Sequence, residues 1–310
     1  MKKTNQLYAY ISIRNVFFAE VGIGIPANTI LLLFHIFMFL LQHKLKPTDL
    51  IMGLLTIIHL GLLIILVYMA TNNFLSQDFG DGIKCKSIIY LHRFLRGFSI
   101  CATCLLSVLQ ATTLSPRTSC LAKFNHKSPH QILCSLVFLW VFYMSLSTLY
   151  SFSAAAISNV TSDGIVSINE FCKIVQMSYF LRHLFYALSA FQDIFLIGLM
   201  ALSSAYMVAL LCRHKRQFQH LHSTRHSSRA CPVQRATTTI LLLTSFFVLM
   251  YWLDTIFSSS RTMWKDDPVC FYIHMMVSNG YATTSPLLLI CTEKRIFRFL
   301  KYYWVRIAHT

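Results

Sequence analysis

Charged side chains stand within long apolar stretches of this sequence, where they can pair with one another or bind a ligand. Arg93 and Arg96 lie one helical turn apart in one stretch, and Asp193 and Asp254 interrupt two later ones. Ionisable residues inside a membrane are costly and mark functional sites by default. The arginines therefore pair with the aspartates, contact a ligand, or do both, and the sequence leaves these alternatives open.

Further polar and aromatic side chains lie at a similar depth. Asp193 and Asp254 each stand about twenty residues from the inner basic boundary, which at about 1.5 Å per residue places them near the outer leaflet. Ligand pockets are mostly apolar and carry a few orienting polar groups. We therefore predict a ligand pocket in the outer half of a helix bundle, with candidate contacts Arg93, Arg96, Tyr186, Asp193, Tyr251, Trp252, Asp254, Asn279 and Tyr281. His35 and His59 are predicted to be packing histidines.

The sequence contains no motif for catalysis. A nucleophile elbow, a phosphate-binding loop and a His-Glu-x-x-His pair are all missing. Cys101 and Cys104 lie inside an apolar stretch without a partner that would stabilise a thiolate, which argues against redox chemistry. Four histidines crowd into residues 212–235, but the arginines between them argue against a metal site. We predict no enzyme activity, no cofactor and no metal.

Two cysteines and one sequon fall on the side that we assign to the cell exterior. Cys85 precedes the third apolar stretch and Cys172 lies between the fourth and fifth, so the two can form a disulfide on the oxidising face. Cys270 lies on the same side as a competing partner, and two free thiols are the alternative. Asn159-Val160-Thr161 is a glycosylation sequon in the same outer loop.

The elements that must position these residues are membrane-spanning helices. Of 310 residues, 55% are hydrophobic and only 12% are charged, whereas soluble domains carry roughly 25% charged residues. A spanning helix needs about 20 apolar residues. Seven stretches meet this length: 16–41, 50–70, 88–114, 131–156, 179–211, 236–257 and 269–291. We predict an all-α membrane protein, a seven-transmembrane helix bundle that forms one domain over residues 1–310.

The distribution of Lys and Arg orients this bundle. Sixteen basic residues fall in the connections and tail on one side and eight on the other. The richer side is cytoplasmic, so the N-terminus is outside and the C-terminus inside, although Lys2, Lys3 and Arg14 oppose this locally. Basic residues alternate with aromatic ones in the tail, 292–310, which favours a short cytoplasmic amphipathic helix.

The net charge of +16 does not indicate nucleic acid, because the basic residues lie in loops next to the membrane. They suit anionic inner-leaflet lipid or a G protein, for which the candidate contacts are Arg117, Arg213, Lys215 and Arg216. A channel or transporter would need polar residues through the full membrane depth, and the inner half is mostly apolar. A non-signalling scaffold is the remaining alternative.

The last apolar stretch carries the polar word "SNGYATTSP" at 278–286. Irregular backbone is tolerated within a membrane where neighbouring protein satisfies it. Pro286 removes one helical donor, and Gly280 with the Ser and Thr residues permits close helix approach. We predict a deformable helix that serves either as a switch or as a static kink.

Several local words of the sequence resemble vomeronasal type-1 receptors. They are "GIPANTILLLFHI", "KPTDLIMGLLTIIHL", "CATCLLSVLQATTLSPRTSCLAKF", "SSAYMVALLCRHKRQFQHLHS", "RATTTILLLTSFFVLMYWLD" and "SNGYATTSPLLLICTEKRI". The resemblance implies a multi-pass plasma-membrane receptor of sensory neurons that detects pheromone or odorant molecules and couples to an inhibitory-class heterotrimeric G protein. Another chemosensory receptor, of taste or odorant type, is the alternative.

The sequence departs from the broader rhodopsin-like pattern at its switch positions. It reads Leu109-Gln110-Ala111 where an Asp-Arg-Tyr would fall. The sixth stretch lacks Cys-Trp-x-Pro, and Ser285-Pro286 lacks the usual Asn and the downstream Tyr. We therefore transfer no rhodopsin-type activation switch to this sequence.

Overall fold

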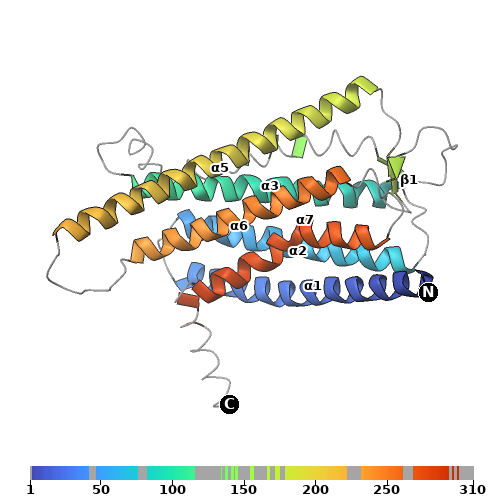
Figure 1. The fold of residues 1–310 in the computed structure, drawn as a ribbon, viewed down its shortest axis with the longest axis horizontal. Helices are drawn as coiled ribbons and strands as arrows, with labels where there is room; N and C mark the ends of the chain where they lie inside the picture. The colour runs from blue at the N-terminus through green and yellow to red at the C-terminus, as the bar shows by residue number, and fades with distance from the viewer. Residues whose placement is uncertain are drawn as a thin grey trace, which may run out of the picture.

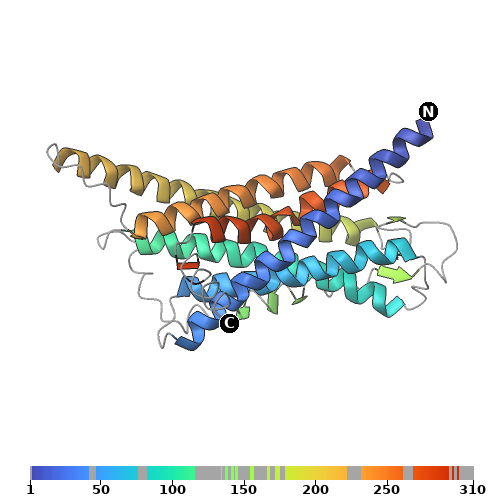
Figure 2. The same ribbon diagram turned by 90° about the horizontal axis from the view of Figure 1, so that it is seen from below.

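A computed structural model describes residues 2–41, 47–75, 82–115, 134, 137–138, 141–142, 144–145, 154–156, 166–167, 172–174, 179–221, 232–260, 268–292, 295–296 and 299. Long helices make up most of this part. They are α1 (Lys2–Leu41), α2 (Pro47–Leu75), α3 (Gly82–Leu114), α5 (Tyr179–Leu221), α6 (Pro232–Ser260) and α7 (Pro268–Thr292). The helices run along one common long axis, with α1 and α5 on opposite sides (Figure 1). Seen from below, α1 crosses the bundle obliquely (Figure 2), and it packs on α2 and α7.

Within the described residues, five helices are long and apolar enough to cross a membrane: Leu7–Leu41, Pro47–Thr71, Tyr90–Leu114, Asp193–Arg213 and Thr237–Asp254. The helix α7 is not among these five, because the polar word in its middle lowers its mean hydropathy. The helical bundle fits a membrane protein. The fourth expected span, 131–156, lies largely outside the described residues, and seven positions between 134 and 145 are helical.

The helices extend beyond the spans expected from hydropathy. The helix α1 begins at Lys2 rather than at residue 16, and α5 continues to Leu221 rather than ending at 211. A hydropathy window detects the part of a helix that suits hydrocarbon, whereas the helix itself can continue through polar residues. The expected fourth span was wrong at its end, because Ala154–Ala156 forms a strand.

That strand belongs to a small antiparallel sheet, which the all-α expectation lacked. Its strands are β1 (Ala154–Ala156), β2 (Val166–Ser167) and β3 (Cys172–Ile174), in the order β1-β3-β2. Cys172 stands opposite Ala156 in the ladder. The strand β1 contacts α3 and lies beside one end of it (Figure 1).

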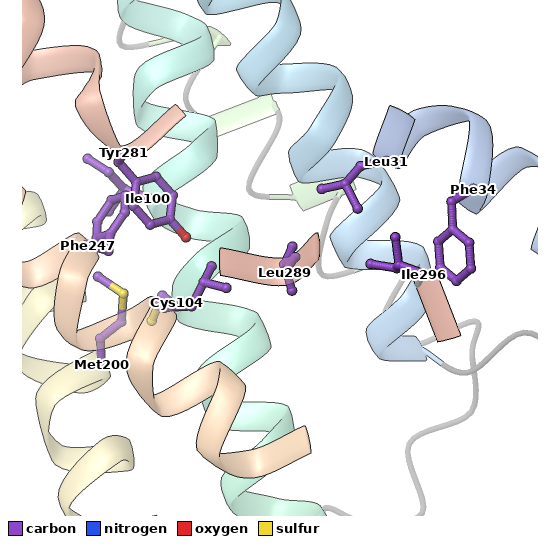
Figure 3. Close-up of a cluster of buried hydrophobic side chains, with 10 residues drawn as sticks. Leu31, Phe34, Ile100, Cys104, Met200, Phe247, Tyr281, Leu289 and Ile296 are labelled. Carbon is purple, nitrogen blue, oxygen red and sulfur yellow. The ribbon is translucent and has the colours of Figure 1, made fainter. Parts of the chain in front are cut away.

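A hydrophobic core runs along the inside of the bundle. Its buried members come from α1, α3, α5, α6, α7 and the residues after α7: Leu31, Phe34, Ile100, Cys104, Met200, Leu243, Phe247, Tyr281, Leu289 and Ile296. Figure 3 shows Tyr281, Phe247 and Ile100 grouped at one end of this cluster, with Leu31, Phe34 and Ile296 at the other. The core therefore reaches from the polar word of α7 to the segment that follows α7.

The backbone defect at Pro286 is repaired by another helix. Proline has no N–H, so the carbonyl of Ala282, four residues earlier, loses its helical donor. The Asn28 side-chain nitrogen of α1 donates to this carbonyl at 2.9 Å, and also to Gly24 O at 2.8 Å. The helices approach closely here, since a Cβ on Gly24 would lie 2.6 Å from Thr283 Oγ1.

The described residues that follow α7 lie against α1 and α2. Arg295 donates to both carboxylate oxygens of Asp49, at 3.2 and 3.4 Å. The Phe299 ring packs on Phe34 and Phe37, with centroid separations of 5.5 and 5.1 Å. Arg295 and Phe299 belong to the predicted amphipathic tail, and both make contacts with other helices of the protein.

Candidate functional site

A small cavity of about 40 Å³ lies between four helices. On α6 its lining residues are spaced i, i+3, i+4 and i+7, and on α3 they are spaced i, i+3 and i+4, so each helix presents one face. The lining residues are His59, Leu62, Arg96, Ser99, Ile100, Phe247, Met250, Tyr251, Asp254, Ser278, Asn279, Tyr281 and Ala282. The cavity is thus mostly apolar or aromatic and carries one ion pair.

Arg96 of α3 joins α6 and α7 across this cavity. Its guanidinium forms an ion pair with Asp254 and donates to the hydroxyl of Ser278. The Arg96 side chain is 26% exposed and that of Asp254 is 10% exposed, so water screens the pair only weakly. His274 of α7 lies 3.5 Å from the other Asp254 oxygen.

A second aspartate supports the cavity from α5. The Tyr251 hydroxyl of α6 donates to Asp193 Oδ2 at 2.8 Å. Tyr251 lines the cavity, so Asp193 orients a wall residue without being part of the lining. Asn279 donates to Met275 O at 3.0 Å and is buried.

Aromatic rings close the cavity toward the core. The Tyr281 ring meets Phe247 edge to face at a centroid separation of 4.4 Å, and meets His59 in the same way at 5.1 Å. Edge-to-face contacts are favoured because the positive ring edge meets the negative ring face. These three side chains therefore form a wall beneath the ion pair.

His59 packs in the bundle and also forms hydrogen bonds to two other helices. Its Nε2 lies 3.0 Å from Ser99 Oγ of α3, and its Nδ1 lies 3.1 Å from Ser285 Oγ of α7. Both ring nitrogens thus have hydroxyl partners, which satisfies a histidine that is only 2% exposed. The imidazole of α2 ties α3 to α7 next to Pro286.

A family model described as the vomeronasal organ pheromone receptor family matches residues 11–302. The chain belongs to this family. Rat vomeronasal type-1 receptor 90 is 57% identical over 301 residues, which cover 97% of each chain. Rat vomeronasal type-1 receptor 94 is 49% identical over all of this chain and 95% of the relative. Mouse vomeronasal type-1 receptor A11 is 48% identical over 97% of this chain and 95% of the relative.

Members of this family are G-protein-coupled receptors and not enzymes. The chain is a vomeronasal pheromone receptor. The charged residues within its apolar stretches therefore belong to the helix bundle of a receptor.

The structure brings five of the nine predicted pocket residues to one cavity of this receptor. They are Arg96, Tyr251, Asp254, Asn279 and Tyr281. Asp193 lies one hydrogen bond behind them, and Arg93 is not in the lining of this cavity. Trp252 is 61% exposed on the outer face of α6. The Tyr186 side chain lies outside the described residues.

Most of the other predicted sites of the receptor also fall outside the described part. The side chains of Cys85, Cys172, Lys215 and Arg216 are not described, nor are Arg117 and Asn159. Arg213 is described and is exposed near the end of α5.

Several residues at the cavity were not predicted from the receptor sequence. Ser278 is part of the quoted polar word, and His274 lies four residues before it on the same face of α7. Ser99 follows Arg96 by three residues, so helical spacing from Arg96 could have found it. The apolar members Leu62, Ile100 and Met250 carry no signal that separates them from ordinary core residues.

Proposed function

We propose that this vomeronasal receptor detects small pheromone- or odorant-type molecules in the cavity around Arg96 and signals through an inhibitory-class heterotrimeric G protein. The observation that carries the proposal is the Arg96 guanidinium, held by Asp254 and Ser278 at the wall of an aromatic cavity. A site with a few converging polar groups in an apolar lining is the usual form of a small-molecule pocket.

Ligand entry requires the lining side chains to move. Pockets for drug-sized molecules measure roughly 300–1,000 Å³, whereas this cavity measures about 40 Å³. Met250 is the most adaptable lining residue, since its thioether chain has three rotatable bonds. Binding thus exchanges contacts among lining residues for contacts with the ligand.

The ion pair indicates which contacts a ligand replaces. A ligand with an acidic or hydrogen-bond-accepting group competes with Asp254 and Ser278 for the Arg96 donors. Because these partners sit on α6 and α7, their release loosens two helices together. Ligands act by binding one helix arrangement better than another.

We place this receptor in the plasma membrane as a single seven-helix domain with an outer N-terminus and a cytoplasmic tail at 292–310. The five apolar helices and the sixteen basic residues on one side support this topology. Reporter tags at each terminus, probed with antibodies before and after permeabilisation, test it. Staining of a C-terminal tag on intact cells would reverse the orientation.

The outer loop is proposed to carry a Cys85–Cys172 disulfide and a glycan on Asn159. The support is that β3, which includes Cys172, pairs with β1, and that β1 contacts α3. Loss of a native disulfide costs about 2–5 kcal/mol, so Cys85→Ser should reduce surface delivery. Maleimide labelling of both cysteines without reductant would refute the bridge, and unchanged gel mobility of Asn159→Gln would refute the glycan.

The G-protein class is tested in transfected cells exposed to a panel of volatile and steroid-like compounds. We expect an active compound to lower a forskolin-raised cyclic AMP level, and a toxin that uncouples inhibitory-class G proteins to abolish the effect. A response that survives the toxin would exclude this G-protein class. A ligand-gated current in the absence of G protein would favour the channel alternative.

A further inference from the structure

A second, smaller cavity lies beyond His59, toward the expected inner side of the bundle. His59 of α2 lines both cavities: the other α2 residue of the first lining follows His59, and those of the second precede it. On α7, the second cavity is lined by Ser285 and Leu289, which follow the α7 residues of the first. It measures about 10 Å³. Its lining consists of Asn28, Leu31, Met52, Leu55, Thr56, His59, Leu106, Leu243, Ser285 and Leu289.

Asn28 presents an unpaired oxygen in this lining. Both hydrogens of its side-chain amide are used, one on Gly24 O and one on Ala282 O. Asn28 is fully buried, and no donor among the described residues reaches its Oδ1. A buried acceptor of this kind is unfavourable unless something donates to it.

The other polar groups of the lining also offer oxygen lone pairs. Thr56 donates its only hydroxyl hydrogen to Met52 O at 2.8 Å, so its oxygen can only accept further bonds. Ser285 shares one hydrogen bond with His59 and has a lone pair left. An occupant of this cavity must therefore be a hydrogen-bond donor.

The size of the cavity and the lack of charge in its lining limit which species can occupy it. A cavity of about 10–15 Å³ holds one water molecule, provided that the water finds two to four polar partners. None of the ten lining residues carries a carboxylate, so a cation here would be a buried charge without a counter-ion, which is costly. A single water satisfies both conditions.

We propose that this cavity binds one structural water, which donates to Asn28 Oδ1 and to the hydroxyl oxygen of Thr56. The water links α1 to α2 at the level of Pro286, where the helical hydrogen bonding of α7 is interrupted and Asn28 donates to Ala282 O. His59 lines both cavities, so this water is separated from the ligand cavity by one imidazole. The proposal does not depend on where the ligand binds.

Radiolytic footprinting of the purified full chain tests the site. An X-ray pulse turns bound water into hydroxyl radicals that oxidise neighbouring side chains, and Met52 in the lining offers a reactive sulfur. Met52 is partly buried, so its oxidation rate in the wild-type receptor is the reference with which the variants are compared. Thr56→Val, which removes one acceptor at constant shape, should reduce Met52 oxidation severalfold.

Thr244→Val is the matched control. Thr244 is as buried as Thr56 and makes the same hydrogen bond to the carbonyl four residues earlier, at 2.8 Å, but it is in neither lining. Equal Met52 oxidation in the two variants would overturn the proposal. A rise in wild-type Met52 oxidation when choline replaces sodium would also overturn it, because a cation then occupies the cavity.

A density map of the wild-type receptor that resolves ordered water gives an answer without any variant, should Thr56→Val fail to fold. A peak within hydrogen-bond distance of Asn28 Oδ1 supports the proposal. A protein donor on that oxygen, or no peak beside it, overturns it.

Discussion

At the scale of single residues, Arg96 has a structural role as the ion-pair partner of Asp254, and we propose that it also contacts the ligand. If Arg96 orients an acidic ligand group, Arg96→Gln raises the half-maximal ligand concentration at least about tenfold, or about 1.4 kcal/mol. The dose–response curve at normal surface abundance measures this. Arg93→Gln is the control, because Arg93 carries the same charge one turn away but is not in the lining. An unshifted curve in Arg96→Gln would leave this arginine with a structural role alone.

The partner of Arg96 supplies the second prediction. Asp254→Asn leaves the arginine charge partly buried without its carboxylate, and breaking such a pair costs about 3 kcal/mol. We expect Asp254→Asn to lower the melting temperature of the purified receptor more than the double variant Arg96→Gln/Asp254→Asn does, because the double variant removes both charges. Additive losses would contradict a direct coupling between the two residues.

The sequence could identify these charges but could not pair them. Arg93 and Arg96 share an approximate depth and helix face, so the sequence allowed either to meet Asp193 or Asp254. The pairing depends on how far each helix is rotated about its axis, which is set by packing and not by depth. The same reason explains Trp252, whose aromatic ring was expected in the pocket and is exposed in the bundle.

At the scale of elements, the α7 carbonyl that Pro286 leaves without a helical donor is hydrogen-bonded by a side chain of α1. Asn28→Leu removes the donor to Ala282 O and leaves a buried carbonyl unpaired, at about 1–3 kcal/mol. In the background of Pro286→Ala the helix supplies its own N–H to that carbonyl, so the same substitution should cost less. Thermal unfolding of the four receptors in this double-mutant cycle measures the difference. An equal cost of Asn28→Leu in both backgrounds would show that the proline defect is not what Asn28 repairs.

Two glycines of α1 provide a matched pair for helix packing. A Cβ on Gly24 would lie 2.6 Å from Thr283 Oγ1 and 2.9 Å from Leu63 Cδ1, whereas a Cβ on Gly22 meets nothing within 4 Å. Gly24→Ala should therefore destabilise the receptor by about 1–3 kcal/mol, and Gly22→Ala should be neutral or stabilising by up to about 1 kcal/mol. Surface abundance and melting temperature compare the two. A harmless Gly24→Ala would mean that α1 and α7 lie further apart than described.

Hydropathy predicted where the apolar parts of α1, α2, α3, α5 and α6 lie, because burial in hydrocarbon demands an apolar run of fixed length. It could not predict the polar continuation of α1 back to Lys2 or the strand at Ala154–Ala156. Those features depend on backbone hydrogen bonding outside the apolar runs. The word "SNGYATTSP" marked α7 as irregular, but the repair by Asn28 joins residues 254 positions apart, which no local pattern reveals.

At the scale of the whole molecule, polar groups and basic charge are separated along the bundle axis. The cavity around Arg96 gathers an ion pair and hydrogen-bonding groups toward the expected outer end. At the other end, Arg295 contacts Asp49 of α2 and Phe299 packs on Phe34 of α1. Composition alone predicted the membrane helix bundle, whereas the orientation inferred from Lys and Arg stays a prediction. In that orientation, a signal from a ligand at Arg96 would cross the apolar core that Figure 3 shows.

The last prediction concerns the basic residues that we propose as contacts of the G protein. Arg213 is exposed near the end of α5, and Lys215 and Arg216 follow it in the sequence. If these charges contact the G protein, replacing all three by Gln lowers ligand-induced signalling while surface abundance stays normal, since rim charges mainly affect the rate of association. If they only anchor the receptor to anionic lipid, worth about 1 kcal/mol per basic residue, surface abundance falls instead and signalling per receptor is unchanged. Measuring both quantities in the same cells separates the two roles, and an unchanged signal at unchanged abundance would remove these residues from the G-protein contact.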